Sequence, residues 1–93
     1  MDARENAETL ALRALGWLAG TEDLLPVFLA SSGLDESDLR TRAGDPELLA
    51  AVLDFLLMDD LWVKGFCDDA GISYGRVVEA RAALPGGEQV HWT

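Results

Sequence analysis

The segment from residue 45 to residue 58, DPELLAAVLDFLLM, limits the folds open to this chain more than any other segment. It opens with Asp, Pro and Glu, a strong signal for a helix start, because proline at the first helical position loses no hydrogen bond. From Leu48 to Met58 the only charged residue is Asp54. Since a helix that is apolar nearly all round is usually central to a core, we expect a helix over 47–58 with other helices packed around it.

This placement carries two further expectations. If the other helices cannot wrap fully around it, Leu57 and Met58 stay exposed, and an exposed apolar patch of that kind marks an interface. We expect the most deeply buried residues of the chain to be Leu48, Val52, Phe55 and Leu56.

The residues before this segment predict three helices. Apolar residues at positions 7, 10, 11, 14, 15 and 18 recur with the helical period and form one face of the first helix. Glycine after a helix, and Thr or Asp before one, are the usual boundary signals. We expect Glu22 and Asp23 in the first turn of the second helix. In chain order, the expected ends and caps are Gly20 (end), Thr21 (cap), Gly33 (end), Asp35 (cap) and Gly44 (end).

The residues after the central segment predict two more helices. The first spans 60–70 and ends at Gly71, and the second spans 74–84 with Ser73 as its cap. No run of useful length alternates with period two, so no sheet is expected. The sequence therefore predicts an all-α fold, a compact bundle of five or six short helices. The expected domain covers 1–87, and 88–93 form a C-terminal tail. The side chains expected to face inward on the last helix are Val77, Val78 and Leu84.

The chain also carries a weak internal similarity at a spacing of 38 residues. The shift places Leu10 on Leu48 and Phe28 on Phe66, and it places Gly33 on Gly71. Identity is low, and two leucine-rich helical segments can match by chance. The bundle is therefore either a single unit or two repeats of three helices, and the sequence alone leaves this open. Two copies are too few for a solenoid.

Residues 66–81, FCDDAGISYGRVVEAR, have the outline of a helix-turn-helix, a unit that repressors place on DNA. The same outline recurs at 28–39, where the second helix would present three carboxylates to the phosphates. A glycine that ends one helix and a residue that caps the next explain both outlines without DNA. In 66–81, acidic neighbours offset Arg76 and Arg81. A structural connection is favoured, and a DNA-binding regulator stays as the alternative.

The charge of the chain bears on its partners. Seven Lys and Arg stand against 17 Asp and Glu, which gives a net charge of −10. Residues 1–46 carry 4 basic and 9 acidic groups, and residues 47–93 carry 3 and 8, so neither half hides a basic patch. Binding to nucleic acid is disfavoured, because it depends on Lys and Arg that neutralise phosphates. The net charge also fits solubility, or an acidic mimic of nucleic acid.

Few residues suggest chemistry. The single histidine, His91, lies on the tail, so a Cys67–His91 pair would need that tail to complete a site. Cys67, beside an aromatic residue on a helix, is better explained as a small buried hydrophobe. The aspartate pairs 59/60 and 68/69 lack the spacing of a calcium loop. We expect no enzyme, no catalytic or metal-binding residues and no cofactor.

The remaining expectations concern tryptophan and location. Trp17 and Trp62 are expected in the core, whereas Trp92 on the tail can fold back or contact a partner. The charged N-terminus lacks the apolar stretch of a secretory signal, and no apolar run approaches the roughly 20 residues of a membrane helix. A single cysteine fits a reducing compartment. We expect a cytoplasmic protein that does not enter membranes.

Four segments carry a resemblance to a known family. They are AETLALRALGWLAG (7–20), FLASSGLDESDLRTRA (28–43), DPELLAAVLDFLLMDD (45–60) and FCDDAGI (66–72). With them the chain resembles a family of short alphaproteobacterial proteins, domain-of-unknown-function family 3572. The resemblance implies a small helical protein and assigns no activity, cofactor, partner or site residue.

By elimination, the sequence favours a small acidic helical protein that acts by protein–protein interaction, as a regulatory or interaction module. The alternatives are a helix-turn-helix regulator built on 66–81 and an acidic mimic of nucleic acid. The expected partner is another protein, and a monomer is favoured. No partner-binding residue can be named from the sequence.

Overall fold

The computed structural model describes residues 2–86, which form six α-helices and no strand. The all-α bundle predicted from the helical period is therefore confirmed. No helix within the described residues is long and apolar enough to cross a membrane. In chain order the helices are α1 (Ala3–Gly20), α2 (Leu24–Ser32), α3 (Glu36–Thr41), α4 (Pro46–Leu57), α5 (Asp60–Ala70) and α6 (Tyr74–Ala83).

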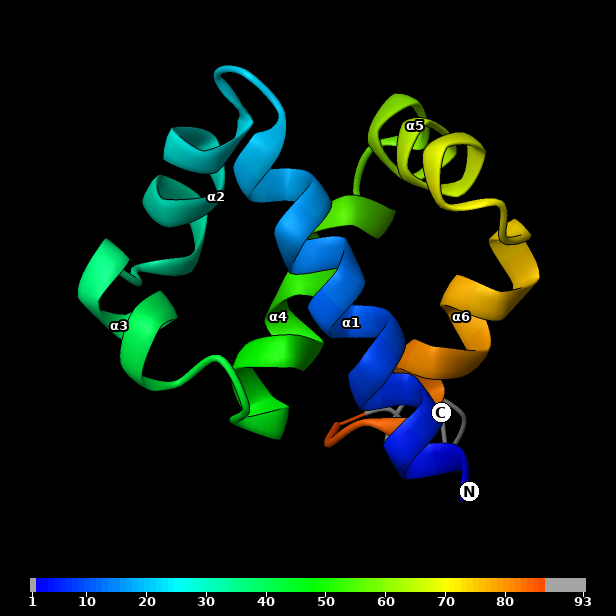
Figure 1. The fold of residues 1–93 in the computed structure, drawn as a ribbon. Coiled ribbons are helices and arrows are strands. Elements are labelled where there is room, and N and C mark those ends of the chain that lie inside the picture. Colours follow the sequence, from blue (N-terminus) through cyan, green and yellow to red (C-terminus); the bar gives the residue numbers. More distant parts are fainter. Residues whose placement is uncertain (1, 87–93) are drawn as a thin grey trace.

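Helices α1 and α4 cross at the centre, with α2 and α3 on one side and α5 and α6 on the other (Figure 1). The central placement of α4 is confirmed, and seven of its residues are buried. Leu57 is half-buried and Met58 is 73% exposed, so the wrapping stops at the end of the helix. The four residues expected to be the deepest are buried, but Leu18 and Phe28 on other helices are buried as completely. Helix α1 is thus as central as α4.

The two halves of the chain interlock. Helix α2 packs on α4, and α5 packs on α1, so the second helix of each half lies on the first helix of the other. The rings of Trp17 and Phe66 lie 6.0 Å apart, and those of Phe55 and Phe28 lie 5.3 Å apart. Thirty-eight residues separate Trp17 from Phe55 and Phe28 from Phe66. The two aromatic pairs therefore occupy equivalent places, which supports the internal repeat.

The repeat is most complete at two connections, the first elbow (28–39) and the second elbow (66–77). Gly33 and Gly71 end the helices with φ of 79° and 72°, the left-handed conformation expected for them. Each glycine N–H donates to the carbonyl four residues earlier. Each following helix is capped by a side chain, Asp35 or Ser73, that accepts from the amide three residues later. Both elbows therefore share one backbone design.

Two expectations were wrong in detail. Thr21 does not cap α2, because its N–H donates to the Leu18 carbonyl and its hydroxyl to the Trp17 carbonyl, which closes α1. Helix α2 begins after Asp23 instead, so Glu22 and Asp23 precede its first turn. On α6, Val78 is 42% exposed and does not face inward. The buried stripe of α6 follows residues 77, 80 and 84, from which position 78 is turned by about 100°.

The outer helices of the two halves differ in their packing. Helix α6 packs against α1, α4 and α5, and it buries Val77 and Ala80. Helix α3 has only six residues and buries none of them. Its half-buried Leu39 is its main link to the core. The first half is therefore less covered than the second.

Candidate functional site

Helix α2 is the one helix of the described chain without a charged residue. Only Leu24 and Phe28 are buried, yet the positions that face outward are also mostly apolar. Val27 is 44% exposed. A helix with apolar residues on its solvent side is unusual in a chain of net charge −10. We call this surface the outer face of α2 and define it as Leu25, Pro26, Val27, Leu29 and Ala30.

On one side of the outer face, α2 and α3 enclose an open groove of about 730 Å³. This volume lies within the range of sites that accept small molecules or peptide side chains, about 300–1,000 Å³. Two carboxylates from the start of α3 stand at its edge. The residues that line it are Leu25, Pro26, Leu29, Ala30, Leu34, Asp35, Glu36 and Ser37.

On the other side lies a smaller pocket of about 260 Å³, which we call the corner pocket. One face of the Trp62 ring stacks on Phe55 at 4.5 Å, so the opposite face or the edge lines this pocket. Neither Glu22 nor Asp23 forms an ion pair within residues 2–86, and the Asp23 carboxylate caps no backbone N–H. Its lining is Thr21, Glu22, Asp23, Leu24, Val27 and Trp62.

The second elbow has a groove at the equivalent place, of about 390 Å³. There, Lys64 and Asp68 stand where the first groove has Pro26 and Ala30, and they form an ion pair at 3.8 Å. The charges of a surface ion pair are hydrated, so covering them with an apolar partner would cost desolvation free energy. The same backbone thus carries an apolar groove in one half and a charged one in the other.

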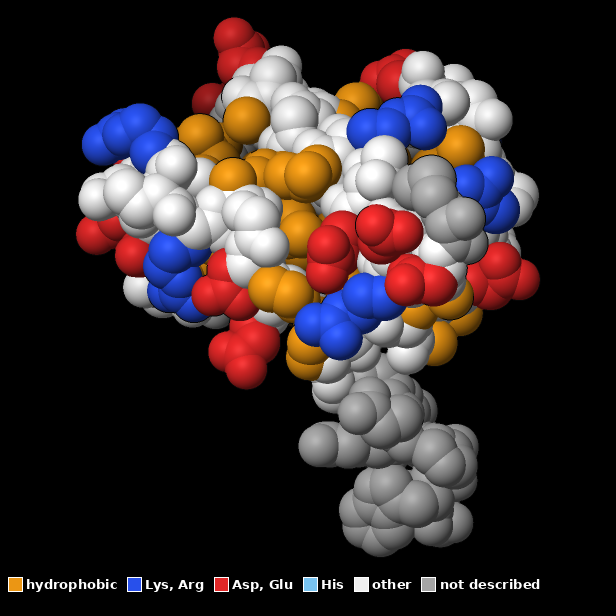
Figure 2. Space-filling model, turned by 60° about the horizontal axis from the view of Figure 1, so that its bottom comes forward, with side chains coloured by type: hydrophobic (Ala, Val, Ile, Leu, Met, Phe, Trp, Pro, Cys, Tyr) orange, Lys and Arg blue, Asp and Glu red, His pale blue; other side chains and the backbone are white. Residues whose placement is uncertain are grey.

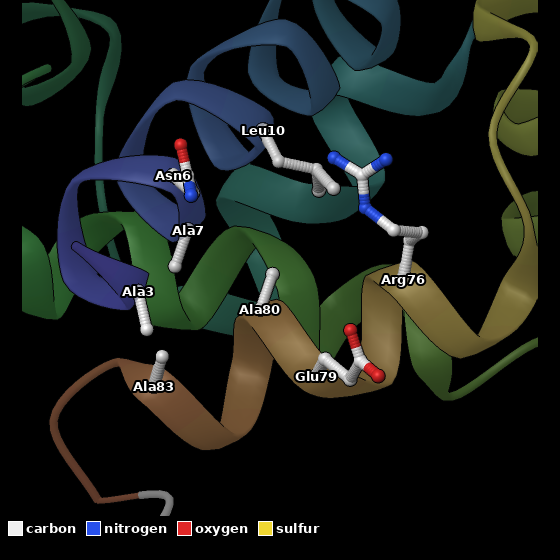
Figure 3. A pocket seen from close by; sticks show the side chains of 8 residues that line it. All are labelled: Ala3, Asn6, Ala7, Leu10, Arg76, Glu79, Ala80 and Ala83. Carbon is white, nitrogen blue, oxygen red and sulfur yellow. The ribbon is translucent and has the colours of Figure 1, made fainter. Parts of the chain in front are cut away.

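The crevice between α1 and α6 is the fourth hollow, and Figure 3 shows Ala3 and Ala83 pointing toward one another across it. Arg76 and Glu79 lie on the α6 side and point in different directions (Figure 3). Its volume is about 220 Å³. Short alanine side chains between two packed helices account for the gap.

Among residues 2–86, the side chains considered for chemistry are accounted for by burial, capping and hydrogen bonds. Cys67 is buried as predicted, and its burial, followed by the charge of Asp68, raises the pKa of its thiol, which disfavours the reactive thiolate. Asp59 caps α5, and Asp69 accepts a hydrogen bond from the Trp17 indole at 2.6 Å. Within residues 2–86, no three His, Cys, Asp or Glu side chains gather as metal ligands.

The structure describes two of the three tryptophans. Trp17 and Trp62 are half-buried at the edge of the core, where they pack against it. The tail at 88–93, with His91 and Trp92, lies outside the described residues.

The basic side chains are dispersed. Figure 2 shows the Lys and Arg side chains of one face as separate groups with other side chains between them. In the second elbow and its helix, Lys64 pairs with Asp68 and Arg81 pairs with Asp54. Arg76 is left as the one basic residue of α5 and α6 without an ion pair within residues 2–86. The helix-turn-helix outline therefore lacks a row of free cations.

The outer face of α2 was missed from the sequence, although a signal was present. Between Asp23 and Asp35 there is no charged residue, whereas the central segment contains Asp54. Both runs are apolar enough to predict a buried helix. Only the packing decides which of the two apolar helices is enclosed.

Comparison with known proteins gives one match. No curated protein and no solved structure matches the chain. A family model described as "Protein of unknown function (DUF3572)" matches residues 4–87, which is most of the sequence. The resemblance drawn from the four segments is confirmed, and the chain belongs to the DUF3572 family.

Proposed function

We propose that this protein is a small, non-enzymatic interaction module that binds another protein through the outer face of α2. The observation that carries the proposal is that α2 has no charged residue while Pro26, Val27 and Ala30 on its outward side remain exposed. An exposed apolar surface of this kind costs free energy in water unless a partner covers it. The groove beside it has room for the side chains of a docking peptide.

The two rival functions have less support. A DNA-binding regulator would need several free cations along the second elbow and the helices on either side of it. There, Lys64 and Arg81 are each paired with a carboxylate, and Arg76 alone is unpaired within residues 2–86. An acidic mimic of nucleic acid needs only the net charge, and it leaves the apolar face of α2 without a role. We therefore also propose a cytoplasmic protein without affinity for duplex DNA.

The test compares three forms of the protein as bait in an affinity capture from cell lysate treated with nuclease. Ala30→Asp copies the residue that α5 carries at the equivalent place, Asp68, so the helix should accept it. Ala82→Asp adds the same charge to an exposed alanine of α6 as a matched control. We expect a protein retained by the original chain and by Ala82→Asp, and lost from Ala30→Asp. Equal retention by all three forms would contradict the proposal.

A further inference from the structure

We infer that the partner segment is apolar in its middle and carries Lys or Arg at its ends, with one basic side chain in the corner pocket. This inference rests on the proposed function and specifies the chemistry of the occupant. It is argued from the charges that border the outer face of α2 and from the lining of the corner pocket.

The apolar part of the occupant follows from the outer face itself. Leu25, Leu29 and Leu34 are half-buried and line one groove with Pro26 and Ala30. A helix of nine residues is about 13 Å long, so the face has room for the side chains of two or three turns of a partner helix. Apolar side chains there would be removed from water, which stabilises the complex.

The basic ends of the occupant follow from the charges at both ends of α2. Glu22 and Asp23 precede the helix, and Asp35 and Glu36 follow it. No Lys or Arg occurs between Arg13 and Arg40. Neither the groove nor the corner pocket beside the face is lined by a Lys or Arg, and both are lined by carboxylates. Complementary charges on a partner would therefore be cationic.

The corner pocket is the place where a cation would be held most closely. Its two carboxylates carry two full negative charges, whereas the N-terminus of α2 contributes only about half a positive charge. The local potential therefore favours a cation. The indole of Trp62, stacked on Phe55 on one side, also lines the pocket, and a cation placed over its other face would be attracted by it.

The same charges argue against a second copy of this chain as the occupant. Two α2 helices packed together, parallel or antiparallel, would bring carboxylates at 22 and 23 near carboxylates at 22 and 23 or at 35 and 36. Like charges brought together at an interface oppose association. A partner of opposite charge meets no such repulsion.

The experiment titrates the isotope-labelled protein with a synthetic helical peptide that has leucines along one face and an arginine at each end. Two reference peptides replace the arginines by glutamates or the leucines by serines. The reporter is the indole N–H signal of Trp62, identified from its loss in Trp62→Phe. The Trp17 indole, which donates to Asp69, serves as an internal control.

We expect the arginine–leucine peptide to shift the Trp62 signal and the α2 amides, and both reference peptides to bind more weakly. Glu22→Gln with Asp23→Asn should weaken its binding about three- to tenfold, since two exposed charge pairs are lost. Glu5→Gln with Glu79→Gln removes the same charge elsewhere and should leave the affinity unchanged.

Three results would overturn the inference: no shift on α2, equal binding of the glutamate peptide, or an unchanged affinity in the 22/23 variant. These results are separable from a failure of the proposed function. Suppose that Ala30→Asp loses the captured protein, but that the variant with Glu22→Gln and Asp23→Asn binds the arginine–leucine peptide as tightly as the original chain. The outer face of α2 then docks a partner whose ends are not basic. A dimer of the free chain in light scattering that Ala30→Asp converts to a monomer would show that a second copy occupies the face.

Discussion

The first and second elbows share a backbone and differ in what they expose. Both have a left-handed glycine and a side-chain cap at matched positions, and in both halves a phenylalanine of the second helix lies in the core. Outside the core, α2, which leads into the first elbow, carries Pro26 and Ala30, whereas α5, which leads into the second, carries Lys64 and Asp68. The difference teaches that the helix-turn-helix outline reports chain geometry only, and that the surface residues decide what either elbow can bind.

The strongest test of the equivalence is to remove the two matched phenylalanines. Phe28 is 0% exposed and Phe66 is 1% exposed. Phe28→Ala and Phe66→Ala should each lower the free energy of unfolding by about 3–5 kcal/mol, the usual cost of this change in a core. Urea unfolding followed by circular dichroism measures both. A cost below about 1 kcal/mol for either variant would show that the two halves are not packed alike.

The next largest effect concerns the glycines. Gly33→Val and Gly71→Val should each destabilise the fold by at least about 1 kcal/mol, because a β-branched residue is strained at positive φ. No other atom crowds the added Cβ at either place, so strain is the only expected source. Thermal melting curves of the two variants should shift by similar amounts. An unchanged curve for one of them would mean that its elbow can adopt another backbone conformation.

The caps allow a finer comparison. Asp35→Ala and Ser73→Ala each remove an acceptor for one backbone amide, at 2.9 and 3.2 Å, and should cost about 0.5–2 kcal/mol. Asp35 also belongs to a reciprocal pair with the Asp38 side chain, and charged acceptors bind more strongly than hydroxyls. We expect the larger loss at Asp35 in chemical denaturation at neutral pH. The reverse order would show that the exposed α3 contributes little to stability.

The smallest effect on stability comes from converting one surface into the other. Pro26→Lys with Ala30→Asp gives α2 the ion pair of α5. The free energy of unfolding should change by no more than about 0.5 kcal/mol, because such a pair contributes roughly 0.2–0.5 kcal/mol and offsets part of the lost proline rigidity. Binding at the outer face of α2 should nevertheless be lost. If the variant keeps both its stability and its binding, the partner does not bind at the outer face of α2.

Local sequence signals predicted most of the fold. Pro46 after Asp45, and the glycines at 33 and 71, mark boundaries that depend on backbone chemistry within one or two residues. The start of α2 was missed because a threonine at position 21 can either cap the following helix or close the preceding one. In the structure it closes α1, by donating to the carbonyls of Trp17 and Leu18. The inward assignment of Val78 failed for a similar reason, since a valine fits either side of a helix.

The candidate site was harder to predict because it consists of α2 residues that the other helices leave uncovered. The apolar runs in α2 and α4 look alike in sequence, and only the packing of the other helices leaves α2 partly exposed and encloses α4. The corner pocket joins residues near position 22 to Trp62, a pairing for which the sequence has no local signal.

The lack of buried residues in α3 has a consequence for the motions of the protein. A helix of six residues held mainly by capping bonds and the half-buried Leu39 can open without unfolding the rest, so its amide protons should exchange with solvent sooner than those of α4. The opening would also widen the groove beside α2. A partner that docks in the groove would hold α3 closed. Slower exchange of the α3 amide protons would then show that the partner is bound, although α3 forms the opposite wall of the groove from α2.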